Sequence, residues 1–124
     1  MRIAQVSADY PHRGEVFFVD LDPVIGSEQG GRRPALVVQN DIANRFSSVV
    51  IVALITSRPA KKIYPFEVRV TPVQSGLPRT SRILLNQIRT IDKRRFERRA
   101  GQLAPETMLG VDRAMRVSLG LEPI

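Results

Sequence analysis

Short apolar runs separated by polar turns make up most of this chain, and their spacing predicts strands. Residues 15–21, EVFFVDL, and 35–40, ALVVQN, are rich in Val, Phe and Leu. Residues 48–55, SVVIVALI, are almost continuously apolar, which predicts a central strand that is buried on both faces. In PFEVRV, residues 65–70, apolar and charged positions alternate, which predicts a half-buried strand with Glu67 on its solvent face.

The remaining pattern predicts two more strands, a helical turn and one late helix. The strands are expected at 81–87 and, shorter, around 99–103, and a turn is expected at 72–78. Residues 41–46 predict one helical turn after an N-cap at Asn40 or Asp41. A C-terminal amphipathic helix is predicted from its first-turn proline, its apolar face and the glycine at its end: Pro105, then Met108, Val111, Met115 and Leu119, then Gly120.

Five or more short strands with one late helix indicate a mainly β protein with some α structure, a small and partly open barrel with helical cover. A parallel α/β fold is disfavoured, because helices do not alternate with strands. Residues 1–12 show no periodicity and are expected to form an N-terminal arm, and residues 13–124 a single barrel domain.

Charge changes the picture more than any other feature of the composition. Lys and Arg number 19 against 12 Asp and Glu among 124 residues, a formal net charge of +7, which indicates an anionic partner such as nucleic acid or an acidic protein. The chain has no Cys and a single His, so disulfides and Cys- or His-rich zinc sites are excluded. No apolar run reaches the roughly 20 residues of a membrane span, and a signal peptide core is lacking, so a cytoplasmic protein is expected.

The loop at residues 22–34 is about twice as long as a connection between two strands needs to be, which indicates a functional segment. Its glycines allow tight turns and close approach of a ligand to the backbone. Arg32 and Arg33 supply fixed positive charge with planar, forked donors that suit phosphate. Arg33 precedes Pro34, so its backbone is constrained near the start of a strand.

Four segments in one order resemble the MazF/PemK-like toxins, the ribonuclease half of bacterial toxin–antitoxin pairs. The segments are RGEVFFVDLDPVIGSEQGGRRPALVVQND at 13–41, IVALITS at 51–57, YPFEV at 64–68 and NQIRTIDKRR at 86–95. The resemblance implies an SH3-like barrel and a homodimer whose RNA groove crosses the subunit boundary. It also implies an antitoxin whose acidic, disordered tail occupies that groove, and a sequence-specific endoribonuclease that cleaves single-stranded mRNA.

Cleavage of RNA needs no cofactor, because the 2′-OH can attack the adjacent phosphate and leave a 2′,3′-cyclic phosphate and a 5′-OH. Positioning and preorganised cations then supply most of the acceleration, and no metal ion is required. The resemblance carries a catalytic arginine onto Arg33, to stabilise the transition state, and a catalytic threonine onto Thr56, to bond the scissile phosphate or orient the 2′-OH. Glu28 is a weaker catalytic candidate, as a proton acceptor.

The predicted RNA-binding residues come from the same motifs: Ser27, Gln29, Gly30, Arg32, Ser57, Asn86, Gln87 and Arg89. Some relatives have an acidic residue where Asn86 stands and others an arginine where Leu84 stands, so proton transfer through a carboxylate is not available at Asn86. Gln87 is expected to bind a base, since its amide both donates and accepts. Aromatic residues are few and Phe17, Phe18 and Phe66 are expected in the core, so hydrogen bonds should outweigh stacking.

Two other functions remain open from the residues alone. The same barrel occurs in toxins that bind and poison DNA gyrase, but those end in a tryptophan-containing segment and this chain has no Trp. A non-catalytic RNA-binding barrel would share the positive charge. The general acid and base are not assigned, and His12, the single histidine, is expected to have a minor role in the arm.

Overall fold

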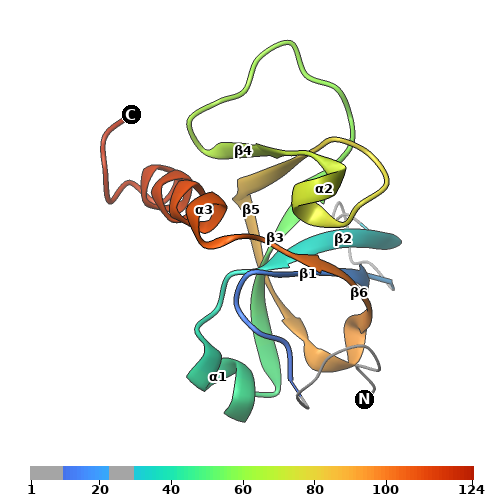
Figure 1. Cartoon of the computed structure of the whole chain (residues 1–124). Helices are drawn as coiled ribbons and strands as arrows, with labels where there is room; N and C mark the ends of the chain where they lie inside the picture. The colour runs from blue at the N-terminus through green and yellow to red at the C-terminus, as the bar shows by residue number, and fades with distance from the viewer. Residues whose placement is uncertain (1–9, 23–29) are drawn as a thin grey trace.

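The computed structural model describes residues 10–22 and 30–124, whose six strands form one open antiparallel sheet in the order β4-β5-β3-β2-β1-β6 (Figure 1). The strands are β1 (Glu15–Asp20), β2 (Arg32–Val37), β3 (Val49–Thr56), β4 (Glu67–Val70), β5 (Ser81–Asp92) and β6 (Phe96–Gln102). The helices are α1 (Asp41–Phe46), α2 (Pro72–Ser75), the 3₁₀ turn η1 (Lys93–Arg95) and α3 (Pro105–Ser118). The predicted mainly β architecture with a C-terminal helix is confirmed.

Both faces of the sheet carry a hydrophobic core, and β3 contributes to both. Ala53 and Ile55 belong to the cluster that includes Val111 and Ala114 of α3, so this helix covers one face of the sheet. Val52 and Leu54 belong to the opposite cluster. The central strand predicted at 48–55 is therefore confirmed, including its burial on both faces.

The pairing of β3 with β5 is interrupted by a bulge. Ala53 lies opposite Ile88, but its neighbour Leu54 lies opposite Leu84, so the register shifts between them. Residues 85–87 consequently have no partner on β3, and such a bulge bends the strand and redirects its side chains. Two predicted RNA-binding residues, Asn86 and Gln87, lie on this bulge.

The segment predicted as a turn at 72–78 contains the one-turn helix α2. A capping box explains it, because the Thr71 side chain accepts from the Gln74 N–H while the Gln74 side chain accepts from the Thr71 N–H. Gly76 ends the helix with a φ of +78°, and a Cβ at this position would lie 2.0 Å from the carbonyl oxygen of Ala100. The glycine thus lets the end of α2 pack directly on the backbone of the edge strand β6.

Several element boundaries differ from those predicted. β2 begins at Arg32 because Arg32, Arg33 and Pro34 pair with β1, and Pro34 is tolerated because β2 pairs with β3 only from Ala35 onward. β5 continues to Asp92 and β6 begins at Phe96, since these charged stretches pair along β3 and β1. The strands predicted at 81–87 and around 99–103 are therefore longer than expected.

The two predicted helices are confirmed in place. α1 is capped by Asn40, whose side chain accepts from the Ala43 N–H at 2.9 Å, and α3 begins at Pro105. Leu119, predicted on the buried face of α3, lies beyond the helix end and is 59% exposed. None of the helices in the described ranges is long and apolar enough to cross a membrane.

Candidate active site

Arg33 lies on β2 directly after the glycine-rich loop, where backbone contacts close the base of that loop. The Gly31 N–H donates to Asp22 Oδ1 at 2.9 Å, and the Leu21 N–H donates to the Gly31 carbonyl at 2.9 Å. Arg33 is half-buried, and its Nε donates to the Gly30 carbonyl at 3.3 Å. Within residues 10–22 and 30–124 no carboxylate forms an ion pair with Arg33.

Thr56 ends β3 and faces the same groove. It is half-buried, and its Oγ1 accepts from the Arg58 N–H at 3.1 Å, which fixes the hydroxyl at the start of the β3–β4 loop. Two cavities, of about 410 and about 230 Å³, are each lined by Arg33, Ile55 and Thr56. The two predicted catalytic residues therefore share one open groove, although 22 positions separate them in the sequence.

The larger cavity adds positive charge and one aromatic ring. Arg32 and Arg79 line it, as does Phe18, whose ring lies 4.4 Å from the guanidinium carbon of Arg98. Arg32 is itself paired with Glu97 of β6, and this hydrogen bond and charge raise the pKa of Arg32 above its ordinary value. Phe18 is half-buried and packs against the core while it also lines this cavity; Phe17 is fully buried, and Phe66 is half-buried and stacked on Tyr64.

The smaller cavity brings together the amides of the β5 bulge and a buried ion pair. Asn86 and Gln87 line it beside Arg58, Glu67 and Arg82. Glu67 was predicted on a solvent face, but its side chain is only 7% exposed and accepts from Arg82 Nη1 at 3.2 Å through both oxygens. That prediction was wrong because a charged partner on the neighbouring strand, which local alternation does not reveal, allows the carboxylate to be buried.

The other predicted site residues differ in whether they lie near the two cavities. Ser57 is exposed and lines the larger cavity, and Gly30 contacts Arg33 through its carbonyl. Arg89 lies further along β5, opposite Val52, and lines neither cavity. Ser27, Glu28 and Gln29 lie outside the described residues. His12 stacks on Tyr10 and lies 3.7 Å from Glu15, and it lines neither cavity.

The sequence analysis missed Arg79 and Arg82 as groove residues. Arg79 directly follows the turn predicted at 72–78, no role was predicted for it, and the signal available was its positive charge. Arg82 lies opposite Thr56 on β5, a pairing that appears only when the register between β3 and β5 is known. The site therefore holds more guanidinium groups than the two at the start of β2.

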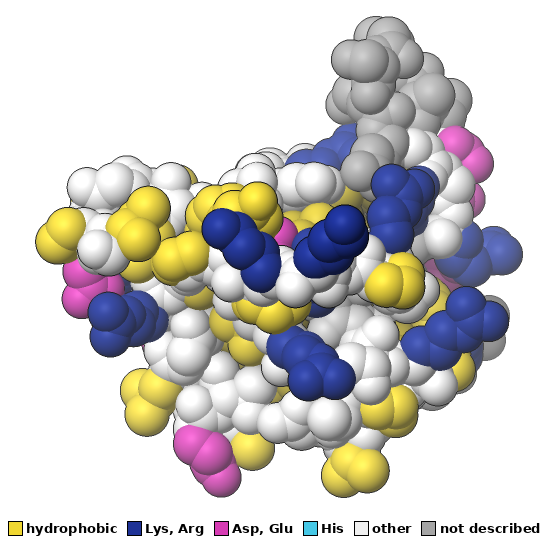
Figure 2. Space-filling view, turned by 90° about the horizontal axis from the view of Figure 1, so that it is seen from above, with side chains coloured by type: hydrophobic (Ala, Val, Ile, Leu, Met, Phe, Trp, Pro, Cys, Tyr) yellow, Lys and Arg dark blue, Asp and Glu magenta, His cyan; other side chains and the backbone are white. Residues whose placement is uncertain are grey.

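The face from which the β3–β4 loop projects is predominantly basic. Figure 2 shows Lys and Arg side chains gathered around a hollowed centre on this face, with most of the visible acidic side chains toward its margins. In the part of the chain that the structure describes, no group of three or more His, Cys, Asp or Glu side chains could hold a metal ion. Guanidinium groups beside a hydroxyl and two amides suit binding of a phosphodiester and stabilisation of charge that develops on its oxygens.

Comparison with known proteins places this geometry in context. Residues 12–119 match the family described as PemK-like, MazF-like toxin of type II toxin-antitoxin system. The chain is 52% identical over 109 residues to Endoribonuclease EndoA of Bacillus subtilis (strain 168), which covers 88% of this chain and 94% of that protein.

Two solved structures extend the likeness to the fold. A mycobacterial endoribonuclease in complex with its cognate antitoxin has a TM-score of 0.75 and 28% identity, over 90% of this chain and 97% of that one. MazF from Deinococcus radiodurans has a TM-score of 0.73 and 31% identity, over the same 90% and 97%.

Proposed function

Because the chain belongs to the PemK-like, MazF-like toxins of type II toxin–antitoxin systems, we propose that it cleaves single-stranded RNA at specific sequences without a metal ion. It is an endoribonuclease, like its Bacillus subtilis relative. The reaction is attack of the 2′-OH on the adjacent phosphate, which breaks the bond to the 5′ oxygen and leaves a 2′,3′-cyclic phosphate and a 5′-OH.

The observation that carries the mechanism is the pair of cavities that Arg33 and Thr56 line together. A phosphate between these side chains receives the forked donors of Arg33, which stabilise the charge that builds on its nonbridging oxygens. The Thr56 hydroxyl, already oriented by the Arg58 N–H, hydrogen-bonds the phosphate or the attacking 2′-OH. These fixed groups need little rearrangement when the bond breaks, which is how preorganised charge lowers a barrier.

Proton transfer falls to groups other than Asn86, because an amide cannot accept a proton at neutral pH. We assign the acceptor role to Glu28, which belongs to the glycine-rich loop that Arg33 follows and lies outside the described residues. Within the described lining of the groove Glu67 is the sole carboxylate, and it is engaged by Arg82.

Base recognition uses the amides of Asn86 and Gln87 in the smaller cavity, since base edges are accessible only in an unpaired strand. The remaining proposed RNA contacts are Ser27, Gln29, Gly30, Arg32, Ser57 and Arg89. A cognate antitoxin is the second partner, as in the antitoxin complexes of the mycobacterial and Deinococcus radiodurans proteins. Its acidic, disordered tail occupies the groove, which a homodimer completes across its subunit boundary.

The test is cleavage of a long single-stranded transcript in the presence of chelator, followed by identification of the new ends. Discrete products with 5′-OH and 2′,3′-cyclic phosphate ends are expected. Arg33→Ala should lower the rate by roughly a hundredfold or more, the usual cost of removing a donor that stabilises a developing oxyanion. Arg33→Lys should recover part of the rate, because an ammonium keeps the charge and loses the fork.

Arg113→Ala is the matched control, because Arg113 is exposed on α3 and lines neither cavity. It should cleave like the unaltered protein. Full activity of Arg33→Ala would remove Arg33 from the mechanism. Binding without cleavage by the unaltered protein would favour a non-catalytic RNA-binding barrel, and intact RNA with arrested gyrase would favour a gyrase-poisoning toxin.

A further inference from the structure

A third cavity, of about 360 Å³, lies under the β3–β4 loop and is lined by four exposed cations together with Arg82. We propose that this cavity is an RNA phosphate subsite, which holds the strand backbone at phosphates away from the scissile one. The proposal rests on the proposed function, because it concerns the path of the same RNA beyond the groove of Arg33 and Thr56.

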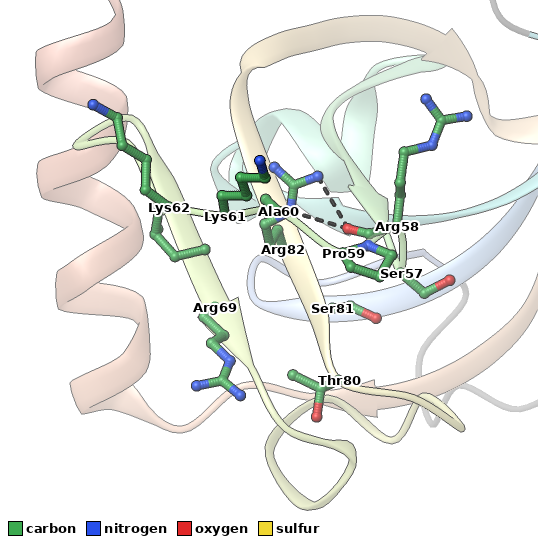
Figure 3. A pocket seen from close by; sticks show the side chains of 11 residues that line it. Ser57, Arg58, Pro59, Ala60, Lys61, Lys62, Arg69, Thr80, Ser81 and Arg82 are labelled. Atoms are coloured by element: carbon green, nitrogen blue, oxygen red, sulfur yellow. Dashed lines mark hydrogen bonds between the residues drawn. The ribbon is translucent and has the colours of Figure 1, made fainter.

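The positive charge of this cavity is not offset by an acidic side chain in its lining. Figure 3 shows that Arg58, Lys61 and Lys62 come from the loop, while Arg69 comes from β4. No Asp or Glu is among the lining residues. In the described part of the chain neither Lys61 nor Arg69 has an ion-pair partner, and Lys62 contacts the ring of Tyr64 at 5.0 Å. Lys and Arg side chains only donate hydrogen bonds, so the ligand must be an acceptor and an anion.

The cavity is held in shape by one ion pair that contacts both ends of the loop. Arg82 donates to the Arg58 carbonyl through Nε at 3.3 Å and Nη2 at 3.1 Å, and Figure 3 shows these bonds under the loop. Its partner Glu67 accepts from the Tyr64 N–H at 3.4 Å. The Arg82 and Glu67 side chains are only 16% and 7% exposed. A largely buried pair with several hydrogen bonds resists opening, so the loop is preorganised over the cavity without a ligand.

The cavity is continuous with the proposed catalytic groove. It shares Ser57 and Ser81 with the larger of the two groove cavities, and Arg58 and Arg82 with the smaller. Thr56, at the centre of the groove, is bonded through its Oγ1 to the N–H of Arg58, a cation that lines the third cavity. A strand whose scissile phosphate lies between Arg33 and Thr56 therefore passes next to these cations when it leaves the groove on the side of the β3–β4 loop.

An acidic protein segment would present the same charge, but the geometry favours RNA. Cations line the cavity from two elements, with Arg58, Lys61 and Lys62 on the loop and Arg69 on β4, so an extended backbone with several phosphates can contact more than one of them. The apolar side chains that line the cavity are Pro59, Ala60 and Ile63, with no aromatic ring among them, so the cavity gives the apolar anchors of a protein partner little to pack against.

The experiment measures how RNA affinity depends on salt. The probe is an oligonucleotide with a mapped cleavage site and a 2′-deoxyribose at the scissile nucleotide, which removes the nucleophile and prevents cleavage. For Lys61→Gln/Arg69→Gln, the slope of log Kd against log salt should fall by about 1.4, which is two phosphate contacts at about 0.7 each. The control, Arg45→Gln/Lys93→Gln, removes the same charges from α1 and η1, at the opposite end of the sheet from the loop (Figure 1), and should leave the slope unchanged.

Cleavage of a short RNA separates the subsite from the catalytic groove. An RNA with only the nucleotides that flank the scissile bond should be cleaved equally by the unaltered protein and by Lys61→Gln/Arg69→Gln. An RNA extended on one side should be cleaved at least roughly tenfold less efficiently by the variant, through KM. The side of the extension that matters, 5′ or 3′, gives the direction of the strand across the cavity.

Each other outcome overturns the proposal. Equal loss of slope in the two double variants would mean that only net charge attracts the RNA. If Lys61→Gln/Arg69→Gln left the slope of log Kd against log salt unchanged but bound a poly-glutamate peptide more weakly than the unaltered protein, the cavity would be assigned to an acidic protein segment. If the unaltered protein cleaves the short RNA, these results leave the proposed function standing; failure of the unaltered protein to cleave any RNA would reject that function itself.

Discussion

Removing Arg82 tests whether the ion pair under the β3–β4 loop positions the active site. Arg82→Met keeps the aliphatic bulk and leaves the Glu67 carboxylate, 7% exposed, without its partner. Removing one member of a buried pair costs about 3–5 kcal/mol, and the 16% exposure of Arg82 places this pair near the lower end, about 3 kcal/mol. In a domain of this size that loss lowers Tm by roughly 10–15 °C.

A control and a second variant separate stability from positioning. Arg116→Met removes an exposed pair with Glu122, where the side chains are 50% and 35% exposed, and should cost less than about 1 kcal/mol. Glu67→Leu/Arg82→Met replaces the buried charges by apolar groups and should recover most of the lost stability. It cannot recover the bonds to the Arg58 carbonyl and the Tyr64 N–H, so the loop and the Thr56 hydroxyl remain less well fixed.

The assay combines thermal unfolding with cleavage of a mapped RNA. We expect Arg82→Met to lose both stability and activity, and the double variant to regain stability while kcat/KM stays at least roughly tenfold low. A double variant that is stable and cleaves at the normal rate would show that the pair is only structural. An Arg82→Met protein no less stable than Arg116→Met would show that the pair does not stabilise the fold.

Two further predictions concern single groups. Thr56→Val should lower kcat roughly tenfold or more while Thr56→Ser retains most activity, because the proposed substrate contact is made by the hydroxyl; equal rates in single-turnover cleavage would exclude that role. Gly76→Ala should cost about 3 kcal/mol or more, since its φ is +78° and a Cβ would lie 2.0 Å from the Ala100 oxygen. Its control is Gly110→Ala in α3, where an added Cβ would have no neighbouring atom within 4 Å and the better helix propensity of Ala should raise Tm. Thermal unfolding of both variants measures this difference in stability.

Patterns that depend on near neighbours predicted the fold well. The apolar run before Thr56 predicted the central strand, and Asn40 and Pro105 marked the helix starts. Arg33 and Thr56 were predicted from motifs, and the structure brings them to the same cavities. These features succeed because an apolar run that is buried on both faces and the capping of a helix are decided within a few residues.

Features that depend on distant partners were missed. Glu67 was predicted to be solvated because its neighbours alternate, yet Arg82 on the adjacent strand allows its burial. The length of β5 and its bulge depend on the register with β3, which no local pattern specifies. The same register places Arg82 opposite Thr56, so its contribution to the groove could not be predicted without the fold.

The amide of Asn86 affects two tasks of the proposed groove, the stabilisation of negative charge and the transfer of protons. Asn86 lines the smaller cavity together with Arg33, Arg58 and Arg82, and a carboxylate at this bulge would lie among these guanidinium groups. Such a carboxylate would pair with them and reduce the positive charge available to a phosphate. The amide leaves Arg33 and Arg58 to the substrate, but it supplies no proton acceptor. In the proposed mechanism, stabilisation of developing negative charge therefore provides the larger share of the acceleration, and proton transfer is assigned to Glu28.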